Sequence, residues 1–339
     1  MTELLENVEL ADKNTFRLPA KARYYAEFAT PEDLKDLLGR PEVMGLPVFV
    51  LGGGSNLVLT KDYEGLMLHS VDCSVRIDRE DDAWVDVTVG AGKDWSEFVL
   101  DAVKNKWSRI ENLSGIPGSV GGAAVQNIGA YGMEVKDAIA SVTCFDPQSQ
   151  SVVRIERKDL AYGYRTSFFK SPEGSKLIVL SVTFHLSKRF VPNLKYQALA
   201  ERLRSLTGKM ITPAVVAGQV REIRKSKLPG LKRLGSAGSF FKNPILSRMH
   251  GRRVLREHPA IPYHTMSSGR IKVSAAWLIA HGRVHGKKCG QAHVFHKAPL
   301  VIVNSGHATA RDVMAVAEAV RDGIKKRYSI IMQYEVVIL

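Results

Sequence analysis

Two glycine-rich segments constrain the fold of this chain more than any other feature. The first, Gly52-Gly53-Gly54-Ser55-Asn56, lies between two apolar runs, residues 47–51 and 57–60, that are too short and too β-like to be helices. The second covers residues 115–122 and is too rich in glycine for a regular strand. Its residues of interest are Ile116, Pro117, Gly118, Ser119 and Gly121. We expect both segments to be loops that expose backbone N–H groups, because glycine has no Cβ to block a ligand.

The first segment alone leaves two interpretations open. A tight turn between strands is common, and short glycine motifs give many false matches. A dinucleotide fold of the Rossmann type needs G-x-G-x-x-G followed by a helix, and neither the spacing nor the following residues match. The second segment is followed by amide side chains and further glycine at Asn127, Gly129, Ala130 and Tyr131. Two separate loops of this kind suit a large dinucleotide such as FAD. The combination resembles the FAD-binding domain of the vanillyl-alcohol-oxidase-type flavoproteins.

Capping and periodicity predict the main elements. Thr30 and Pro31 begin a helix that runs to Leu38, since Thr is a good N-cap and Pro is favoured in the first turn. Further helices are predicted over residues 94–104, 212–227 and 309–326. Strands are predicted over 84–89, through much of 140–187 (most clearly 141–145 and 177–186), and over 334–339.

Composition narrows the class of protein. The chain has 339 residues and a net charge of +14, so anions are expected partners, whether nucleic acid or small phosphorylated ligands. The acidic, polar N-terminus and the absence of a long apolar run predict a cytoplasmic protein without membrane insertion. The three cysteines form no CxxC pair. The spacing of His285, Cys289, His293 and His296 suggests zinc, but Gly286 and Gly290 disrupt a helical face and no HExxH motif is present, so no metal is expected.

Two longer motifs make a closer resemblance. Residues 163–170, Gly-Tyr-Arg-Thr-Ser-Phe-Phe-Lys, and residues 237–244, Ala-Gly-Ser-Phe-Phe-Lys-Asn-Pro, together with the glycine segments, resemble the UDP-N-acetylenolpyruvoylglucosamine reductases (MurB). The resemblance extends from Asn14 to Glu335. It implies non-covalent FAD, NADPH as hydride donor in a ping-pong cycle, and reduction of UDP-N-acetyl-enolpyruvylglucosamine to UDP-N-acetylmuramate, a peptidoglycan precursor.

The resemblance assigns three catalytic residues. Arg165 binds the enolpyruvyl carboxylate, for which a planar guanidinium is well suited, although an arginine in such a segment is more often a surface ion-pair residue. Ser239 donates the proton; it lies outside any G-x-S-x-G motif, so a hydrolase nucleophile is unsupported. Glu335 helps Arg165 to stabilise the enol form, and its simpler interpretation is a salt bridge.

The resemblance also assigns substrate contacts to Tyr131, Tyr196, Lys227 and Asn243, and the presence of Tyr196 points to the type I branch. Taken singly, each of the last three passes as a surface residue, and Lys227 as a residue that compensates a helix dipole. The segment 289–299 is less typical of the family, which leaves substrate contacts there in doubt.

The resemblance predicts an α+β fold: a vanillyl-alcohol-oxidase (PCMH)-type FAD-binding fold plus a C-terminal α+β substrate-binding domain. The predicted divisions are residues 1–70 with 320–339, residues 71–189 and residues 190–319, in a monomer. A flavoprotein oxidase of the same superfamily is the nearest alternative, but the glycine segments lack the His or Cys of covalent flavin attachment. A nucleic-acid-binding protein is suggested only by charge, without a recognisable module.

Overall fold

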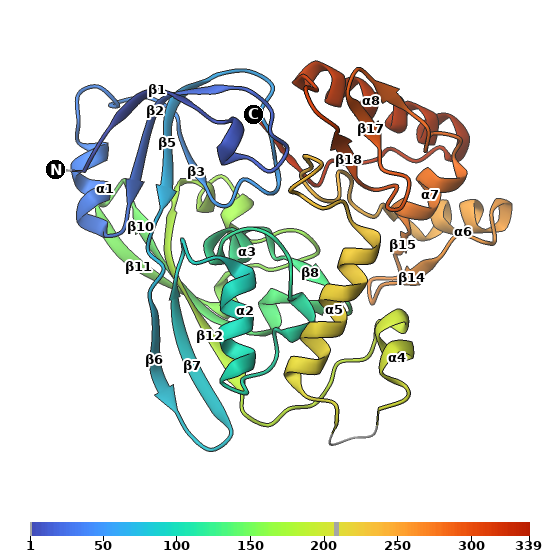
Figure 1. Cartoon of the computed structure of the whole chain (residues 1–339), viewed down its shortest axis with the longest axis horizontal. Coiled ribbons are helices and arrows are strands. Elements are labelled where there is room, and N and C mark those ends of the chain that lie inside the picture. The colour runs from blue at the N-terminus through green and yellow to red at the C-terminus, as the bar shows by residue number, and fades with distance from the viewer. Residues whose placement is uncertain (1, 207–209) are drawn as a thin grey trace. The chain divides into compact units, whose positions relative to one another are not determined.

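The computed structural model describes residues 2–206 and 210–339, and the chain divides into two compact units (Figure 1). Unit 1 contains residues 1–8, 22–53 and 63–226, and unit 2 contains residues 9–21, 54–62 and 227–339. The first glycine loop therefore crosses from one unit to the other between Gly53 and Gly54.

A four-stranded sheet has the order β1 (Leu5–Glu9), β2 (Lys21–Phe28), β5 (Tyr63–Ser70), β3 (Val48–Leu51). All of its residues lie in unit 1 except Glu9 and Lys21, which fall in unit 2. Strands β2 and β3 both run parallel to β5. Helix α1 (Pro31–Leu38) connects β2 to β3, and its capping box joins Thr30 to Asp33. Its buried Leu34 and Leu37 share one core with Phe28. The glycine loop thus follows the carboxyl end of a parallel strand, the usual position of ligand sites in such sheets.

The second sheet of unit 1 is antiparallel, in the order β11 (Ser151–Glu156), β10 (Ile139–Asp146), β12 (Ile178–Ser187), β7 (Trp84–Gly90), β6 (Val75–Glu80). Helices α2 (Trp95–Lys104) and α3 (Val120–Gln126) share its main core, as Figure 1 shows beside β12. Trp95, Phe98 and Phe184 form the aromatic centre of that core, with ring centroids 4.8–5.9 Å apart.

The remaining elements of unit 1 are short, apart from α5. They are the hairpin β8 (Gly129–Ala130) and β9 (Met133–Glu134), helices α4 (Gln197–Leu203) and α5 (Pro213–Lys227), whose last residue falls in unit 2, and 3-10 turns at Glu111–Leu113, Val135–Asp137, Arg157–Asp159, Phe168–Lys170 and Gly174–Lys176. A separate core joins α4 to α5 through Leu199, Leu203, Val216 and Val220.

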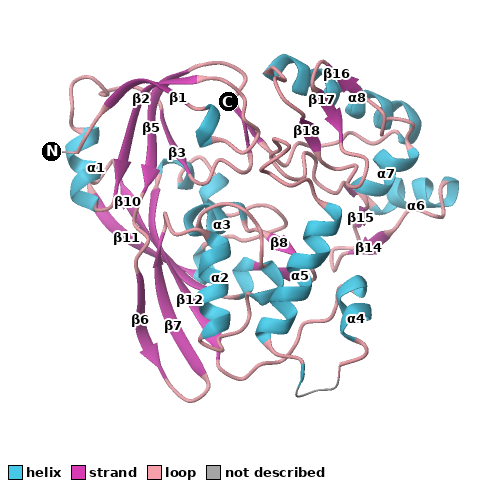
Figure 2. Ribbon diagram, viewed as in Figure 1, coloured by secondary structure: helices cyan, strands magenta, loops and turns pink. Residues whose placement is uncertain are grey.

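Unit 2 combines short strands with longer helices (Figure 2). Its sheets are β13 (Ile245–Leu246), β15 (Ile271–Val273), β14 (Tyr263–Thr265), and β16 (Lys288–Cys289), β17 (Ala292–Val294), β18 (Ile302–Asn304), with the parallel pair β4 (Leu57–Val58) and β19 (Val337–Ile338). Its helices are α6 (Arg248–Glu257), α7 (Ala275–His281), α8 (Ala310–Tyr328) and a 3-10 turn at Ala11–Lys13. Phe16, Phe240, Leu278, Val316 and Val320 lie in its core.

The structure confirms the predicted helices at residues 31–38, 95–104, 213–227 and 310–328 within one residue or two of their expected ends. Three expectations are corrected. The predicted loop 115–122 ends at Ser119, because its last residues begin α3. The predicted strand 334–339 is regular only at Val337–Ile338. Between residues 157 and 177 the chain forms turns and 3-10 segments in place of strands. Of the helices described, none is long and apolar enough to cross a membrane.

Candidate active site

The two glycine segments meet within unit 1. A Cβ on Gly53 would lie 2.8 Å from the Cα of Gly118, and a Cβ on Gly52 would lie 2.8 Å from the Oγ of Ser119. The Gly53 position requires glycine, because the atom in the way belongs to the backbone, whereas a side chain at position 52 would displace the Ser119 hydroxyl. The backbones of the two glycine segments are thus in direct contact. This arrangement is expected if a ligand binds to backbone peptide groups and not to side chains.

The other half of the first loop lies in unit 2, where it is held by residues 13–15. Gly54 has φ +59°, and a Cβ there would lie 2.1 Å from the carbonyl oxygen of Lys13. Its own carbonyl accepts a hydrogen bond from the Thr15 N–H at 3.1 Å. The Nδ2 of Asn56 donates to the carbonyl oxygen of Glu335 at 3.2 Å. The loop therefore fixes the segment that carries one of the predicted catalytic residues.

Ser119 is the N-cap of α3. Its Oγ accepts a hydrogen bond from the Gly122 N–H at 3.2 Å, which satisfies a backbone donor at the helix start. Gly121, in the first turn, lies against Ala91, and a Cβ on Gly121 would be 2.9 Å from the Cβ of Ala91. These contacts explain why a glycine-rich segment forms a helix here.

Asn127 ends α3 in the left-handed conformation, with φ 46°, and is fully buried. Its Nδ2 donates to the Gly163 carbonyl oxygen at 2.8 Å, and its Oδ1 accepts from the Lys136 N–H at 3.2 Å. The side chain therefore joins the end of α3 to the turn that contains Arg165.

Tyr131 lies at the tip of the β8–β9 hairpin. Tyr131 (φ 50°) and Gly132 (φ 81°) are the two central residues of the turn, and both are left-handed, as a type I′ turn requires. Gly129 and Ala130 form the first strand of this hairpin. The Tyr131 ring packs edge-to-face on Tyr196, with centroids 4.9 Å apart. The structure thus brings together two of the predicted substrate residues.

Arg165 occupies a strained turn. Gly163 and Thr166 exchange two backbone hydrogen bonds of 3.0 and 3.2 Å around Tyr164 and Arg165. Arg165 has φ 54°, which favours glycine, and its Nη2 donates to the Gly129 carbonyl oxygen at 2.7 Å. Lys170 donates to the Arg165 carbonyl oxygen at 3.0 Å. A left-handed arginine costs about 1–3 kcal/mol, and such strain is concentrated at functional sites.

Arg224, in α5, is a site residue that the sequence did not predict. Its Nε donates to the Gly115 carbonyl oxygen at 2.9 Å, and its side chain hydrogen-bonds to Tyr131. Burial lowers the pKa of the Arg224 guanidinium and raises the pKa of Tyr131. One side chain thus joins the second glycine loop to the hairpin of Tyr131. Only the i+3 spacing from Arg221 distinguishes it in the sequence, which is too weak a signal.

Ser239 and Glu335 lie on adjacent segments of unit 2. The Glu335 N–H donates to the Phe240 carbonyl oxygen at 2.9 Å, and Phe241 pairs with Tyr334 in an antiparallel bridge. On the other side, Ser239 forms a bridge with Val301, and the Phe240 N–H donates to Leu300. Both predicted residues are half-buried. Backbone pairing therefore fixes Ser239 and Glu335 relative to each other.

Helix α8 supports this pairing through Tyr334. The Tyr334 hydroxyl donates to Glu318 and accepts from the Nη1 of Arg321 at 3.2 Å. Its ring centroid lies 5.6 Å from those of both Phe240 and Phe241. Burial is the main cause of the raised pKa of Tyr334, so its hydroxyl stays protonated and available as a donor.

The remaining predicted site residues lie in several elements. The Oδ1 of Asn243 accepts from the Ala275 N–H at 2.9 Å, at the start of α7. Lys227 is the last residue of α5. Ile116 and Pro117 belong to the second glycine loop, where the Ile116 carbonyl accepts from Ser96 at 3.5 Å. Ser55 precedes Asn56 in the first loop.

In the described ranges, 2–206 and 210–339, no group of three or more His, Cys, Asp or Glu side chains is arranged to hold a metal ion. Cys289 donates to Asp312 at 3.5 Å, and this contact is the main cause of its raised pKa. His293 pairs with Lys288 across β16 and β17, and burial lowers its pKa.

Comparison with known proteins decides the family. Residues 230–339 match the model of the UDP-N-acetylenolpyruvoylglucosamine reductase C-terminal domain, and residues 22–155 match an FAD binding domain. The UDP-N-acetylenolpyruvoylglucosamine reductase of Neisseria gonorrhoeae is 39% identical over 99% of this chain and 97% of its own length. That of Bacteroides fragilis is 40% identical over 98% of both chains. The chain belongs to the UDP-N-acetylenolpyruvoylglucosamine reductase family.

A crystal structure of the family member from Thermus caldophilus has the same fold, with a TM-score of 0.67 and 24% identity over 100% of this chain and 98% of that chain. The predicted fold class, an FAD-binding domain followed by the family's C-terminal domain, is confirmed. The division into residues 1–70 with 320–339, 71–189 and 190–319 stays a proposal beside the two units described above.

The contacts of Gly52, Gly53 and Gly118 fit an FAD-binding domain, since a Cβ on Gly53 would intrude on the backbone of Gly118 where the two loops meet. All three of these glycines lie in unit 1. Of the predicted catalytic residues, unit 1 contains Arg165 and unit 2 contains Ser239 and Glu335.

Proposed function

We propose that this chain reduces UDP-N-acetyl-enolpyruvylglucosamine to UDP-N-acetylmuramate with NADPH as the source of electrons. As a member of its family the chain is an FAD-dependent oxidoreductase with reductase activity in the synthesis of peptidoglycan precursors. The observation that carries the proposal is the 39% identity with the Neisseria gonorrhoeae reductase across 99% of this chain. NADPH, the type I branch, a cytoplasmic location, a monomeric state and the absence of nucleic-acid partners are parts of the proposal.

The glycine loops are the proposed FAD site. The cofactor would be held by residues of the first loop, Gly52, Gly53, Gly54, Ser55 and Asn56, and by residues of the second loop, Ile116, Pro117, Gly118, Ser119 and Gly121. Asn127, Gly129 and Ala130 complete the set. The absence of Cβ atoms at the closest approach of the two loops supports this assignment. The bound flavin would supply hydride transfer, which no side chain can perform.

Arg165 is the proposed carboxylate-binding residue. Its guanidinium would pair with the enolpyruvyl carboxylate and stabilise negative charge that develops on the adjacent carbons. The strained turn supports this role, because it holds the arginine in one orientation before substrate arrives, and preorganised charge costs no rearrangement during reaction.

Ser239 is the proposed proton donor to C2 of the substrate, and Glu335 the carboxylate that helps to stabilise the enol form. A hydroxyl is a weak acid, but it suffices when the carbon that it protonates is strongly basic. The backbone pairing that fixes the two residues supports a shared role.

Tyr131, Tyr196, Lys227 and Asn243 are the proposed contacts to the UDP-sugar. The edge-to-face packing of the two tyrosines supports the first pair, since it prepares one aromatic surface from the hairpin and from the start of α4. The position of Lys227 at the end of α5 leaves an ammonium group at a helix terminus, where it can pair with a diphosphate.

An anaerobic visible absorption spectrum tests the proposal. The purified protein is recorded alone, after one equivalent of NADPH, and after addition of the enolpyruvyl sugar nucleotide. We expect a flavin band that bleaches with NADPH and returns with the sugar nucleotide. NADH at the same concentration is the control for the nicotinamide preference.

Two results would contradict the proposal. A protein that stays colourless after incubation with FAD would refute the cofactor assignment. A flavin that bleaches with NADPH but recovers only with oxygen would favour an oxidase of the same superfamily.

A further inference from the structure

The net positive charge of this protein comes from its last third. Residues 227–339 contain 19 lysines and arginines against five aspartates and glutamates, whereas residues 1–226 contain 29 of each. The whole net charge of +14 therefore belongs to residues 227–339. A general need for solubility does not require such a concentration of charge in one part of the chain.

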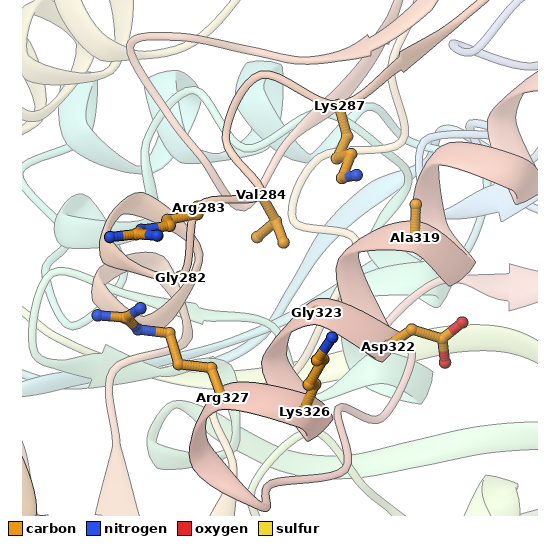
Figure 3. A pocket seen from close by; sticks show the side chains of 9 residues that line it. All are labelled: Gly282, Arg283, Val284, Lys287, Ala319, Asp322, Gly323, Lys326 and Arg327. Atoms are coloured by element: carbon orange, nitrogen blue, oxygen red, sulfur yellow. The ribbon is translucent and has the colours of Figure 1, made fainter.

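Four of these 19 cations line a pocket between α8 and the loop that follows α7. The pocket has a volume of about 640 Å³. Its lining residues are Gly282, Arg283, Val284 and Lys287 from the loop, and Ala319, Asp322, Gly323, Lys326 and Arg327 from α8 (Figure 3). This volume lies in the range of about 300–1,000 Å³ that is usual for small-molecule sites.

Two glycines build the pocket by letting the loop contact the helix. A Cβ on Gly323 would lie 2.3 Å from the Cγ1 of Val284, and a Cβ on Gly282 would lie 2.6 Å from the Cδ1 of Ile324. The next residue, Arg283, has φ 59°, a conformation that favours glycine. The chain thus keeps an arginine in a strained position at the pocket, which is a feature of functional sites.

Four cations and one acid line this pocket. Figure 3 shows the guanidinium groups of Arg283 and Arg327 extending to the same end, with the side chains of Lys287 and Lys326 near the other and Asp322 turned outward. In the part of the chain that the structure describes, no salt bridge neutralises Arg283, Lys287 or Lys326. Arg327 contacts the Tyr328 hydroxyl and ring.

Helix stability alone does not explain the cluster. Lys326 and Arg327 lie in the last turn of α8, where cations compensate the helix dipole. Arg283 and Lys287, however, belong to the loop after α7 and not to α8. Their positive charges repel those of Lys326 and Arg327 and so raise the electrostatic energy of the folded protein. A bound anion would remove this repulsion.

We propose that this pocket binds a compact polyanion with at least two linked phosphate groups. Two guanidinium and two ammonium groups match several phosphate oxygens at once. The lining contains no aromatic ring on which a base could stack, so the phosphate chain is the recognised part. None of the lining residues belongs to the proposed FAD or substrate sites, so the pocket is an additional ligand site of the enzyme.

Isothermal titration of the FAD-loaded full chain with inorganic tripolyphosphate tests this assignment. We expect saturable binding that weakens at least tenfold in the double variant R283Q/R327Q. The double variant R252Q/R253Q removes two exposed arginines of α6 and is the matched control, with unchanged affinity expected within twofold. D322N, which removes the single acid of the pocket, is expected to strengthen binding.

Equal weakening in the pocket and control variants would show that net charge and not the pocket attracts the ligand, and would overturn the proposal. So would affinity for orthophosphate equal to that for tripolyphosphate, or unchanged affinity in R283Q/R327Q, which would locate binding elsewhere. ATP and tripolyphosphate of equal affinity would support recognition of the phosphate chain. Duplex DNA that binds while tripolyphosphate does not would refute a small-molecule site.

Discussion

Individual side chains in this enzyme are held by their neighbours before any ligand binds. Arg165 donates to the Gly129 carbonyl, Asn127 donates to the Gly163 carbonyl, and Arg224 reaches both Gly115 and Tyr131. Asn127, Tyr131 and Arg165 all adopt left-handed conformations. Their shared contacts make the region between α3 and the Arg165 turn a single hydrogen-bonded network, in which one substitution affects several backbone positions.

Ser239→Ala tests the proton donor. We expect flavin reduction by NADPH to proceed at nearly the wild-type rate, while reoxidation by the sugar nucleotide slows by about 100-fold or more, because general acid catalysis contributes about 10²–10⁴-fold. Anaerobic stopped-flow absorbance separates the two steps. Ser268→Ala, at an exposed loop position, is the control. An equal loss in both steps would show that Ser239 does not act as the donor.

Arg224→Lys tests the connection between the second glycine loop and Tyr131. A lysine keeps the charge but cannot hydrogen-bond both partners with the geometry of a guanidinium. Loss of a charge-assisted hydrogen bond costs about 1.5–3 kcal/mol, so FAD affinity should fall by about 10- to 150-fold. Flavin fluorescence titration of the apoprotein measures it. Arg221→Lys, one turn earlier on an exposed position of α5, should leave the affinity unchanged.

Elements were predicted well where their signals were local. Thr30 and Thr309 each begin a helix with a capping box, and both helices form as expected. Helix α3 was missed because Gly121 and Gly122 are poor helix formers. The Ser119 cap is a local signal that favours the helix, but the packing of Gly121 against Ala91 is a tertiary contact that the sequence does not show. The other proposed site residues were predicted from the resemblance of their motifs. Arg224 was not predicted, because it contacts Tyr131, 93 positions away in the sequence, and Gly115, 109 positions away.

Two glycines of similar appearance in the sequence should respond oppositely to alanine. Gly54→Ala introduces a Cβ 2.1 Å from the Lys13 carbonyl oxygen at φ +59° and should lower the free energy of unfolding by at least about 2 kcal/mol. Gly218→Ala, inside α5 with open space around it, should raise it by about 0.5–1 kcal/mol. Urea unfolding followed by circular dichroism measures both. A neutral Gly54→Ala would mean that the loop relaxes without cost.

The 3-10 turn Glu111–Leu113 should make stability depend on pH. Burial raises the pKa of Glu111, although backbone N–H groups of Arg109 and Ile110 bond to its carboxylate at 2.7 and 3.0 Å. The pKa of Glu111 therefore lies higher in the folded protein than in the unfolded chain. The protonated Glu111 carboxyl thus stabilises the folded protein fully at pH values below the unfolded pKa, and this contribution is lost as the pH rises through the folded pKa.

Glu111→Gln keeps an acceptor oxygen but cannot ionise, so its stability should lose this decline with pH. Urea unfolding from about pH 4, near the unfolded glutamate pKa, to about pH 8 compares the two proteins. Parallel curves across that range would show that the burial of Glu111 has no effect on stability.

The net positive charge of the molecule lies in unit 2, where lysines and arginines repel one another. Salt screens exposed charges over about 10 Å at 0.1 M, so NaCl should stabilise the fold. We expect the melting temperature to rise by about 2–4 °C between low and moderate NaCl. For a domain of about 150 residues, such a rise corresponds to about 1 kcal/mol in the free energy of unfolding. R252Q/R253Q, with two charges fewer, should show a smaller rise. An equal rise in both proteins would point to a general salt effect.

The backbone hydrogen bonds of residues 337–339 determine when unit 2 can complete its folding. Thr60 donates to the Leu339 carbonyl at 2.6 Å, Leu339 donates to Val58 at 3.0 Å, and β19 pairs with β4. During synthesis on the ribosome, residues 9–21 and 54–62 emerge long before the partners against which they fold. Closing such long loops is slow. The loop that begins after Gly53 therefore acquires its final neighbours only when translation has reached Leu339.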